Sequence, residues 1–567
     1  MLKYFYMNPD EDKTKAKLDY LRRQEEEEVV QLIARRNGYA YVNLHQISIN
    51  TDALRLIPEN EALAAKMGAY ELINKKLSVA IMSPKNPLTM QVLDRLDRAG
   101  YELKIFVASE SSLEKIWGHY QDLSYAQTTR AGSLEISAQS IADIISKAKD
   151  IPGIKQLIQD AVSSHQSYRV SIIIETILAG ALGTGASDIH LEPEETYARL
   201  RYRLDGVLVD VLDFDNDTLK SLIARLKLLS GMILNIHNKA QDGRFSIKLS
   251  DKEIEIRSSI LPGAYSESMV MRVLNPDSIS VKVEELGMDQ WLLDILLKEI
   301  TKPNGMILTT GPTGSGKTTT LYSFLRKIHT PEIKIITIED PIEYHLPGIV
   351  QTQTDADAGY TFLAGLRAAL RQDPDVIMVG EIRDAETAGI AVQSALTGHL
   401  VFSTLHTNDA AGTFPRLVNL GINPRDTVSA MNVAMAQRLL RKVCQNCHKQ
   451  VPLTAEQKTF FGKVTDSIRN RKLVEGIQTE NIYEAVGCEK CNGTGYKGRI
   501  GIFEIILKNE ALQQELIKEN PNEKAIKKIG LDQGMLDMRQ DGILKILRGL
   551  TTLDELSRVI DLDEEIL

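Results

Sequence analysis

The sequence predicts a multidomain α/β protein whose largest part is built on a parallel β-sheet. Its 567 residues correspond to about four domains of roughly 150 residues each. Hydrophobic residues make up 43% of the chain and charged residues 25%, a composition that is typical of globular proteins and excludes global disorder. Four almost continuously apolar segments suit the strands of a parallel sheet that is covered on both faces. They are MILTT (306–310), IKIITIE (333–339), VIMVGE (376–381) and HLVFSTLH (399–406).

Charge, cysteine content and hydropathy exclude several classes of protein. The net charge of −9 argues against a dedicated nucleic-acid coat protein, because such domains are usually basic. Four cysteines are too few to form a disulfide scaffold in a chain of this length. A membrane span needs about 20 apolar residues, whereas the most apolar segment, 170–182, is shorter and carries Glu175. Since residues 1–17 also lack the apolar core of a signal peptide, we expect a cytoplasmic protein.

The N-terminal part of the chain divides into three regions. Residues 1–36 are expected to form a charged helix, in which the run Glu25–Glu28 lies on a solvated face. Short apolar runs alternate with helical patterns over 37–120, and this alternation predicts a first, small α/β domain. Residues 121–140 are rich in Ser, Thr, Ala and Gln, which predicts a flexible linker.

Four further regions complete the predicted organisation. An apolar helix followed by strand-like alternation predicts a second N-terminal α/β domain over 141–276. The four apolar strands fall within the third region, 277–442. All four cysteines lie within 443–498, and residues 499–567 have a mostly helical pattern that ends in an acidic tail.

The most specific motif is GPTGSGKT at 311–318, which matches the phosphate-binding pattern G-x-x-x-x-G-K-[ST]. An apolar strand precedes it and a helical pattern follows it, as a phosphate-binding loop requires. Glycines let backbone N–H groups surround the phosphates, and the N-terminus of the following helix favours negative charge. We therefore expect Lys317 to bridge the β- and γ-phosphates of ATP and Thr318 to bind Mg²⁺. The predicted nucleotide-binding residues are Gly311, Pro312, Thr313, Gly314, Ser315, Gly316, Lys317, Thr318 and Thr319.

Carboxylates follow two other apolar strands. The segment 376–384 ends in Glu381 and Asp384, which fits a Walker B element, and ITIEDPIEYH (336–345) carries Glu339, Asp340 and Glu343. Ligands of α/β sheets bind at the carboxyl ends of the strands, so these side chains should lie near the phosphate loop. A general base must reach the attacking water directly or through one other water. Glu343 and Glu381 are the two candidates for this role, and surface carboxylates at loop starts are the alternative interpretation.

A fourth apolar strand lies between two histidines, His399 and His406. Residues seven apart on a strand face opposite sides, so at most one of them can face the nucleotide. We favour His406 for a catalytic role; a core or interface role is the alternative.

The four cysteines form two CxxC pairs, Cys444 with Cys447 and Cys488 with Cys491. Two such pairs without a further cysteine predict a closed, tetrahedral structural zinc site. An iron–sulfur cluster, a redox dithiol and buried free thiols are the alternatives.

Together these motifs resemble those of the ATPase family that drives type II secretion and type IV pilus assembly. The resemblance covers residues 150–567 strongly and 28–120 weakly, and it is greatest to the pilus extension motors of the PilB type, with GspE-type secretion motors as close relatives. The matching segments are the Walker A loop (311–318), the Asp box (336–343), the Walker B segment ending at Asp384, the His box (397–409), SDIHLEP (187–193), RYRLDG (201–206), QDGRF (241–245) and GRIGIFE (498–504).

The resemblance implies a RecA-like P-loop core over 277–442, preceded by a PAS-like second domain whose arginines reach the nucleotide. Arg257 and Arg272 lie at the matching places, and Arg244 is a third candidate. Guanidinium groups suit this role because they stay charged and bind phosphate in a bidentate manner. A tetracysteine loop is common in the extension and secretion motors, and the resemblance further implies a homohexameric ring.

The resemblance also implies partners and a location. The first N-terminal domain would dock a polytopic inner-membrane platform protein and a cytoplasmic pilus or secretion adaptor, which places the protein peripherally at the inner face of the cytoplasmic membrane. Some relatives bind cyclic di-GMP in this domain through motifs beginning Arg-Leu-Gly. Because this sequence has no such motif, we expect no cyclic di-GMP binding, and we expect no nucleic-acid partner.

The expected function is ATP hydrolysis coupled to the extension of a type IV pilus. A type II secretion motor with the same chemistry is the main alternative. A DNA-translocating or competence ATPase and a nucleotide-gated scaffold are further alternatives.

Overall fold

The structure is a computed structural model in which the chain forms two compact units. The first contains residues up to 141 with 158–176 and 248–250, and the second contains 142–157, 177–247 and the residues from 251 onward. The structure describes residues 26–44, 47, 49–54, 56–73, 75–118, 120, 133–134, 143–144, 150–163, 169–249, 253–275, 281–518 and 521–562. The predicted linker over 121–140 lies outside these residues, apart from the short strand β5 (Ser133–Leu134).

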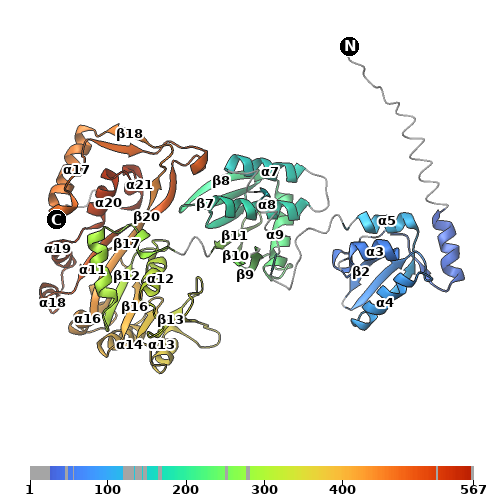
Figure 1. Ribbon diagram of the computed structural model, residues 1–567, viewed down its shortest axis with the longest axis horizontal. Helices are drawn as coiled ribbons and strands as arrows, with labels where there is room; N and C mark the ends of the chain where they lie inside the picture. Colours follow the sequence, from blue (N-terminus) through green and yellow to red (C-terminus); the bar gives the residue numbers. More distant parts are fainter. Residues whose placement is uncertain are drawn as a thin grey trace, which may run out of the picture. The chain divides into compact units, whose positions relative to one another are not determined.

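The first unit holds a four-stranded sheet with the order β1-β4-β3-β2, drawn in blue in Figure 1. Strands β1, β4 and β3 run parallel, and β2 is antiparallel to β3. Helix α4 shows why this sequence is helical locally: Asn86 caps it, Pro87 opens it, and Val92 and Leu96 lie on its buried face. The elements are β1 (Ala40–Tyr41), α2 (Thr51–Leu54), α3 (Glu59–Ala65), β2 (Met67–Ile73), β3 (Lys76–Ile81), α4 (Pro87–Arg98), β4 (Glu102–Val107) and α5 (Glu110–Gly118).

Residues 26–36 are helical, as predicted, but the expectation that Glu25–Glu28 form a solvated face is wrong at Glu27. The carboxylate of Glu27 is buried and accepts hydrogen bonds from Tyr41 Oη at 2.5 Å, Ser109 Oγ at 2.6 Å and Ser112 Oγ at 2.9 Å. Three hydroxyl donors compensate for the desolvation of this charge, so the helix is fixed to the domain by a polar contact that charge patterning does not reveal.

The second unit begins with an antiparallel sheet in which β9, β10, β11, β6, β7 and β8 are neighbours in this order. One face is apolar: Ile189, Tyr202 and Ile256 are buried, and the Tyr202 hydroxyl donates to the Ile177 carbonyl of α8 at 2.6 Å. The alternate residues carry arginines and carboxylates on the other face. The elements along 151–274, of which 158–176 and 248 count with the first unit, are α7 (Ile151–Ser163), α8 (Arg169–Thr184), β6 (Asp188–Pro193), β7 (Ala198–Leu204), β8 (Val207–Phe214), α9 (Asn216–Leu229), β9 (Gln241–Lys248), β10 (Glu253–Pro262) and β11 (Glu267–Leu274).

The predicted parallel sheet is confirmed in the same unit, with the order β14-β13-β15-β16-β12-β17-β20. All neighbours are parallel except β17 and β20, which are antiparallel. Met306 and Ile307 of β12 pack into different hydrophobic clusters, so both faces of the sheet are covered. The elements are η2 (Val283–Glu285), α11 (Gln290–Ile300), β12 (Gly305–Thr310), α12 (Lys317–Ile328), β13 (Ile335–Glu339), β14 (Val350–Gln353), α13 (Phe362–Leu370), β15 (Val376–Val379), α14 (Ala385–Leu396), β16 (Leu400–Leu405), α15 (Thr413–Asn419), α16 (Pro424–Ala430), β17 (Met431–Val443) and β20 (Tyr496–Leu507).

The cysteine-containing segment is an insertion between β17 and β20. Cys444 follows β17 directly, and Cys491 lies shortly before β20. The segment contains β18 (Lys449–Pro452), α17 (Ala455–Ser467), η3 (Arg471–Leu473), β19 (Asn481–Glu484) and η4 (Glu489–Cys491), and the chain then ends in α18 (Glu510–Leu516), α19 (Glu523–Asp532), α20 (Met538–Leu547) and α21 (Leu553–Val559). In the part of the chain that the structure describes, no helix is both long and apolar enough to cross a membrane.

A buried ion pair within α20 holds the carboxylate that joins this helix to β20. Lys545 Nζ lies 2.5 Å from both carboxylate oxygens of Asp541, and Asp541 also accepts from the Phe503 amide at 2.8 Å. The side chains are 2% and 5% exposed, and burial raises the pKa of Asp541.

We expect Lys545→Met to lower the free energy of unfolding of this subdomain by about 3–5 kcal/mol, because it leaves a buried carboxylate without its counter-ion. Thermal unfolding followed by circular dichroism measures the change. Lys545→Met with Asp541→Asn is the matched variant and should recover part of the loss; an unchanged unfolding midpoint in the single variant would contradict the expectation.

Candidate nucleotide and metal sites

The phosphate-binding loop lies between β12 and α12, where the motif predicts it. Gly311, Gly314 and Gly316 have φ values of 143°, 80° and 90°, which side chains other than glycine rarely adopt. A Cβ atom at Gly316 would lie 2.8 Å from Gln437 Nε2, so close packing against β17 also requires glycine there. Helix α12 begins at Lys317, and its N-terminus therefore points its free N–H groups into the loop.

Lys317 is held inside this loop. Its Nζ donates to the carbonyl oxygens of Gly311 at 2.8 Å and Pro312 at 3.1 Å. Burial lowers the pKa of Lys317, and the negative charge of Glu381 acts against that shift. The ammonium group thus lies among carbonyl oxygens and near a carboxylate, in a position from which it can turn toward a phosphate.

Glu381 and His406 lie next to each other after two neighbouring strands, β15 and β16. Glu381 Oε2 is 3.4 Å from His406 Nε2, and the Glu381 side chain, only 14% exposed, also pairs with Arg383. His399 lies at the opposite end of β16, where its Nδ1 is 3.1 Å from the Ser394 carbonyl. The structure therefore brings His406 to the edge of the sheet that carries the phosphate loop, and it keeps His399 away from it.

Glu343 lies close to Arg257, one of the predicted arginines. Arg257 Nη2 donates to the Ile342 carbonyl at 2.6 Å, its Nη1 lies 3.7 Å from Glu343 Oε2, and its Nε donates to Glu255 at 3.1 Å. Arg272 is the neighbour of Arg257 across the β10–β11 pair, but its Nε donates to Asp188 at 3.1 Å. The structure thus brings Arg257 to the Asp box and leaves Arg272 in its own sheet.

Two further strand arginines pair within the antiparallel sheet, whereas Arg244, the third candidate, is an exposed residue of β9. Arg201 contacts Glu192 at 2.5 Å, and Arg203 lies 3.3 Å from Asp188. In the described part of the chain, neither of them forms an ion pair or hydrogen bond with the phosphate loop.

Glu339 has a role that the sequence analysis missed. It lies at the end of β13, and its carboxylate accepts from Thr337 Oγ1 at 2.5 Å, from Gln351 Nε2 at 3.1 Å and from the Tyr322 hydroxyl of α12. Burial raises the pKa of Glu339. Glu339 therefore joins the helix that follows the phosphate loop to the segment that carries Glu343, four residues further along the chain.

Gln437 and Arg438 on β17 are two further polar residues at the loop that the sequence analysis missed. Gln437 is buried, and its Oε1 accepts from Thr320 Oγ1 of α12 at 2.8 Å. Arg438 Nη2 donates to the Asn408 carbonyl at 2.8 Å. The sequence contains one indication of their role, because these two polar residues directly follow the apolar run 433–436 of a buried strand.

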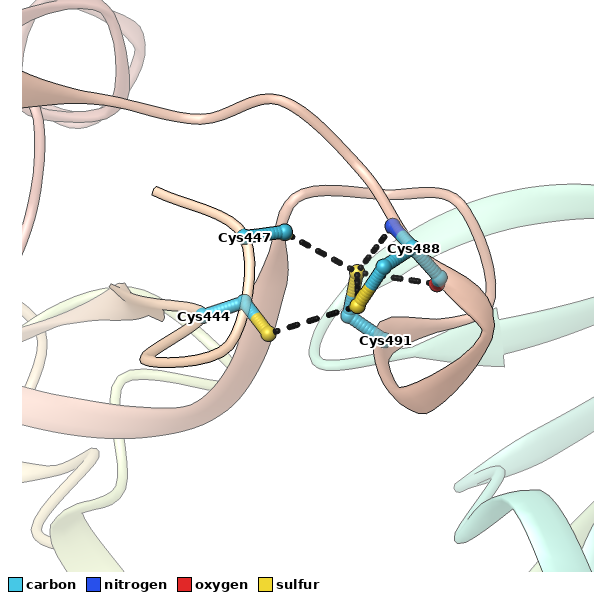
Figure 2. Close-up of side chains that lie close together, drawn as sticks. All are labelled: Cys444, Cys447, Cys488 and Cys491. Atoms are coloured by element: carbon cyan, nitrogen blue, oxygen red, sulfur yellow. Dashed lines mark hydrogen bonds between the residues drawn. The ribbon is translucent and has the colours of Figure 1, made fainter. Parts of the chain in front are cut away.

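The four cysteine thiols converge on one point (Figure 2). Their sulfur atoms all lie within 4.8 Å of one another, with Cys444 and Cys488 at 3.9 Å, Cys447 and Cys491 at 3.8 Å, and Cys488 and Cys491 at 3.7 Å. A disulfide requires about 2.05 Å. A tetrahedral zinc ion with Zn–S distances of about 2.3 Å places its sulfurs about 3.8 Å apart, so the arrangement fits one such ion.

Backbone amides support the same arrangement of thiols. Gly487 N–H donates to Cys447 Sγ at 3.3 Å, and the amides of Cys488 and Gly495 donate to Cys491 Sγ at 3.1 and 3.3 Å. Hydrogen bonds of this kind stabilise thiolates, which are the form of cysteine that binds metal. In a multi-iron cluster the thiols bind different iron atoms. The close approach of the four thiols in this protein therefore favours a single metal ion.

Comparison with known proteins agrees with this geometry. The profile of the family described as "Type II/IV secretion system protein" matches residues 163–558. The chain belongs to this family. Its predicted class, an ATPase of the secretion and pilus-assembly type, is confirmed by relatives that cover most of its length.

The relatives that are similar to this chain include both pilus-assembly ATPases and type II secretion ATPases. It is 36% identical over 532 residues to a Type IV pilus assembly ATPase PilB of Myxococcus xanthus, covering 94% of this chain and 90% of the relative. It is 39% identical over 489 residues to a Type II secretion system ATPase E of Vibrio cholerae, covering 86% and 93%. A Type IV pilus assembly ATPase PilB of Pseudomonas aeruginosa is 41% identical over 402 residues, covering 71% and 69%.

Proposed function

We propose that this protein hydrolyses ATP with Mg²⁺ and uses the energy to extend a type IV pilus, as a homohexameric motor at the inner face of the cytoplasmic membrane. The observation that carries the proposal is the meeting of three strand ends at one edge of the parallel sheet. The phosphate loop with Lys317, the Walker B carboxylate Glu381 and the Asp-box carboxylate Glu343 all follow the carboxyl ends of parallel strands.

The residues of the site have complementary roles in this proposal. The loop amides and Lys317 bind the phosphates, and Thr318, at the second position of α12, would hold Mg²⁺, which neutralises phosphate charge when bound. Glu343 or Glu381 accepts the proton of the attacking water, and His406 orients Glu381 through the 3.4 Å contact. Arginines of the antiparallel sheet, Arg257 foremost and Arg272 as the second candidate, would stabilise the negative charge that develops on the γ-phosphate.

The tetracysteine site has a structural role in the same proposal. All four ligand positions come from Cys444, Cys447, Cys488 and Cys491, so a bound Zn²⁺ would have no open position for catalysis. It would fix the insertion at the ends of β17 and β20. Partners of the proposed motor are a polytopic inner-membrane platform protein and a cytoplasmic pilus or secretion adaptor.

We expect Arg257→Ala to lower ATP turnover by about 10³-fold, in the range of other arginine fingers. Nucleotide affinity should change little, because Arg257 contacts Glu343 and the Ile342 carbonyl rather than the phosphate loop. Arg201→Ala is the matched control, since Arg201 also pairs with a carboxylate in the antiparallel sheet. Phosphate release measures both variants; wild-type turnover in Arg257→Ala, or an equal loss in the control, would contradict the assignment.

The proposal is tested in the host cell by replacing the protein with its Glu381→Gln variant. The variant should fold and accumulate normally, because amide and carboxylate have nearly the same shape, while surface pili disappear. Loss of secreted proteins with intact pili would establish the alternative, a type II secretion motor with the same chemistry. Normal pili and normal secretion would contradict both.

Two other functions lead to different results. A DNA-translocating or competence ATPase would be stimulated by DNA, which the net charge of −9 does not favour. A nucleotide-gated scaffold would bind ATP without turnover. For cyclic di-GMP we expect no saturable binding in the micromolar range by calorimetry.

A further inference from the structure

Arg438 lies directly beside the phosphate loop. A Cβ atom added at Gly311 would be 3.0 Å from Arg438 Nη1 and 2.7 Å from Ser315 Oγ. The guanidinium group and the Ser315 hydroxyl therefore line the same small space next to the first glycine of the loop. Ser315 is 4% exposed, and its Oγ has no hydrogen-bond partner among the described residues.

The guanidinium group of Arg438 forms no direct ion pair with a described residue, and Glu504 and Asp409 act on its charge only from a greater distance. Its guanidinium donates only to main-chain carbonyls, that of Asn408 at 2.8 Å and that of Gln437 at 3.2 Å. In the described part of the chain no carboxylate oxygen lies within 4.0 Å of it, whereas Arg257, Arg272 and Arg441 each have such a partner. Burial lowers the pKa of Arg438, the negative charges of Glu504 and Asp409 act against that shift, and a half-buried cation without a direct ion pair is costly.

A second cation faces the same space. Lys317 Nζ donates to the Gly311 carbonyl at 2.8 Å, so Lys317 and Arg438 both lie against this glycine. Burial lowers the pKa of Lys317, the charge of Glu381 acts against that shift, and the positive charge of Arg438 adds to it. A bound anion would satisfy all the groups at this place. They are the two cations, the unpaired buried hydroxyl of Ser315 and the free N–H groups at the N-terminus of α12.

We propose that Arg438 is a further phosphate-binding residue, which contacts the β- or γ-phosphate of the bound nucleotide from the protein's own β17. The inference rests on the proposed nucleotide site and adds a ligand to it. It also assigns Arg438 a role distinct from that of Arg257, which comes from the antiparallel sheet and already has carboxylate partners. Because Arg438 also holds the Asn408 carbonyl, it links the bound phosphate to the loop that follows His406.

The test compares Arg438→Met, which keeps the length of the side chain but removes the charge, with the full-length wild type. We expect the Kd for ADP and ATP, measured by titration calorimetry with Mg²⁺, to rise at least about tenfold, as for the loss of a hydrogen bond between charged groups. Without nucleotide, the thermal unfolding midpoint should stay the same or rise, since an unpaired cation has been removed. Arg416→Met, at an exposed position of α15, is the matched control and should change neither quantity.

A merely structural role for Arg438 gives the opposite pattern, a lower midpoint without nucleotide and an unchanged Kd, and this result would overturn the inference. If Arg438→Met does not fold, Arg438→Lys decides: a Kd weakened several-fold supports the inference and an unchanged Kd overturns it. Lys317→Ala separates this inference from the proposed function. Loss of binding in Lys317→Ala with normal binding in Arg438→Met refutes only the role of Arg438, whereas normal binding in both refutes the nucleotide site itself.

Discussion

Lys317→Ala is expected to reduce ATP hydrolysis to the background rate and to weaken nucleotide binding strongly. Lys317 is the one ammonium group within the loop 311–316 and the start of α12, and its Nζ is already held there by the carbonyls of Gly311 and Pro312. In the proposed site its replacement would remove a charge-assisted contact to the transferred phosphate, which backbone amides alone cannot supply. Phosphate release measures turnover, and calorimetry with ADP measures binding.

The matched control for Lys317→Ala is Lys327→Ala, at the other end of the same helix. Lys327 is exposed and pairs with Glu284 at 2.7 Å, and a surface pair of this kind contributes little to stability. Turnover in Lys327→Ala should equal that of the wild type. Hydrolysis by Lys317→Ala at more than a few per cent of the wild-type rate would show that the phosphate loop is not the catalytic site.

Replacing Cys488 by Ser is expected to abolish metal binding and to unfold the insertion 443–498. A structural zinc site contributes about 10–16 kcal/mol of apparent binding free energy, which is more than a segment of this size gains from its small core. Elemental analysis should find one zinc per chain in the wild type and none in the variant. Amide hydrogen exchange should become fast over β18 and β19 while β12 and β16 stay protected.

Asn446→Ala is the control for the cysteine variant. Asn446 belongs to the first CxxC pair, and its Nδ2 lies 4.0 Å from Cys444 Sγ, but it is not a ligand. The control should keep its zinc and its slow exchange. Two results would contradict the proposed site. One is iron in place of zinc, and the other is a wild-type protein whose insertion 443–498 stays folded after complete removal of the metal.

The features that the sequence predicted and that the structure shows are those with a local cause. The parallel sheet follows from runs of apolar residues, and the loop geometry follows from glycines that must adopt positive φ at Gly314 and Gly316. At the level of the sequence, strand alternation separated His406 from His399, whereas in the structure the two lie at opposite ends of β16. In each case the physical reason lies within about ten residues of the chain.

The missed features depend on contacts between distant segments. Gln437 bonds to Thr320 over 117 positions, and Glu27 is buried against Ser109 over 82 positions. The sequence shows that Gln437 is polar and Glu27 is charged. It does not show the hydrogen-bond partners that allow these side chains to be buried. Arg257 and Arg272 could not be ranked for the same reason, since only the fold shows that one reaches Glu343 and the other pairs with Asp188.

The central claim is that ATP hydrolysis at this site is coupled to a membrane assembly platform. The test is phosphate release by the full-length protein with Mg²⁺ and ATP. It is measured under three conditions: with the protein alone, with vesicles that contain the host's platform protein, and with DNA. We expect basal turnover that the platform protein increases and that DNA leaves unchanged. Bound ATP that stays intact under all three conditions, or stimulation by DNA alone, would contradict it.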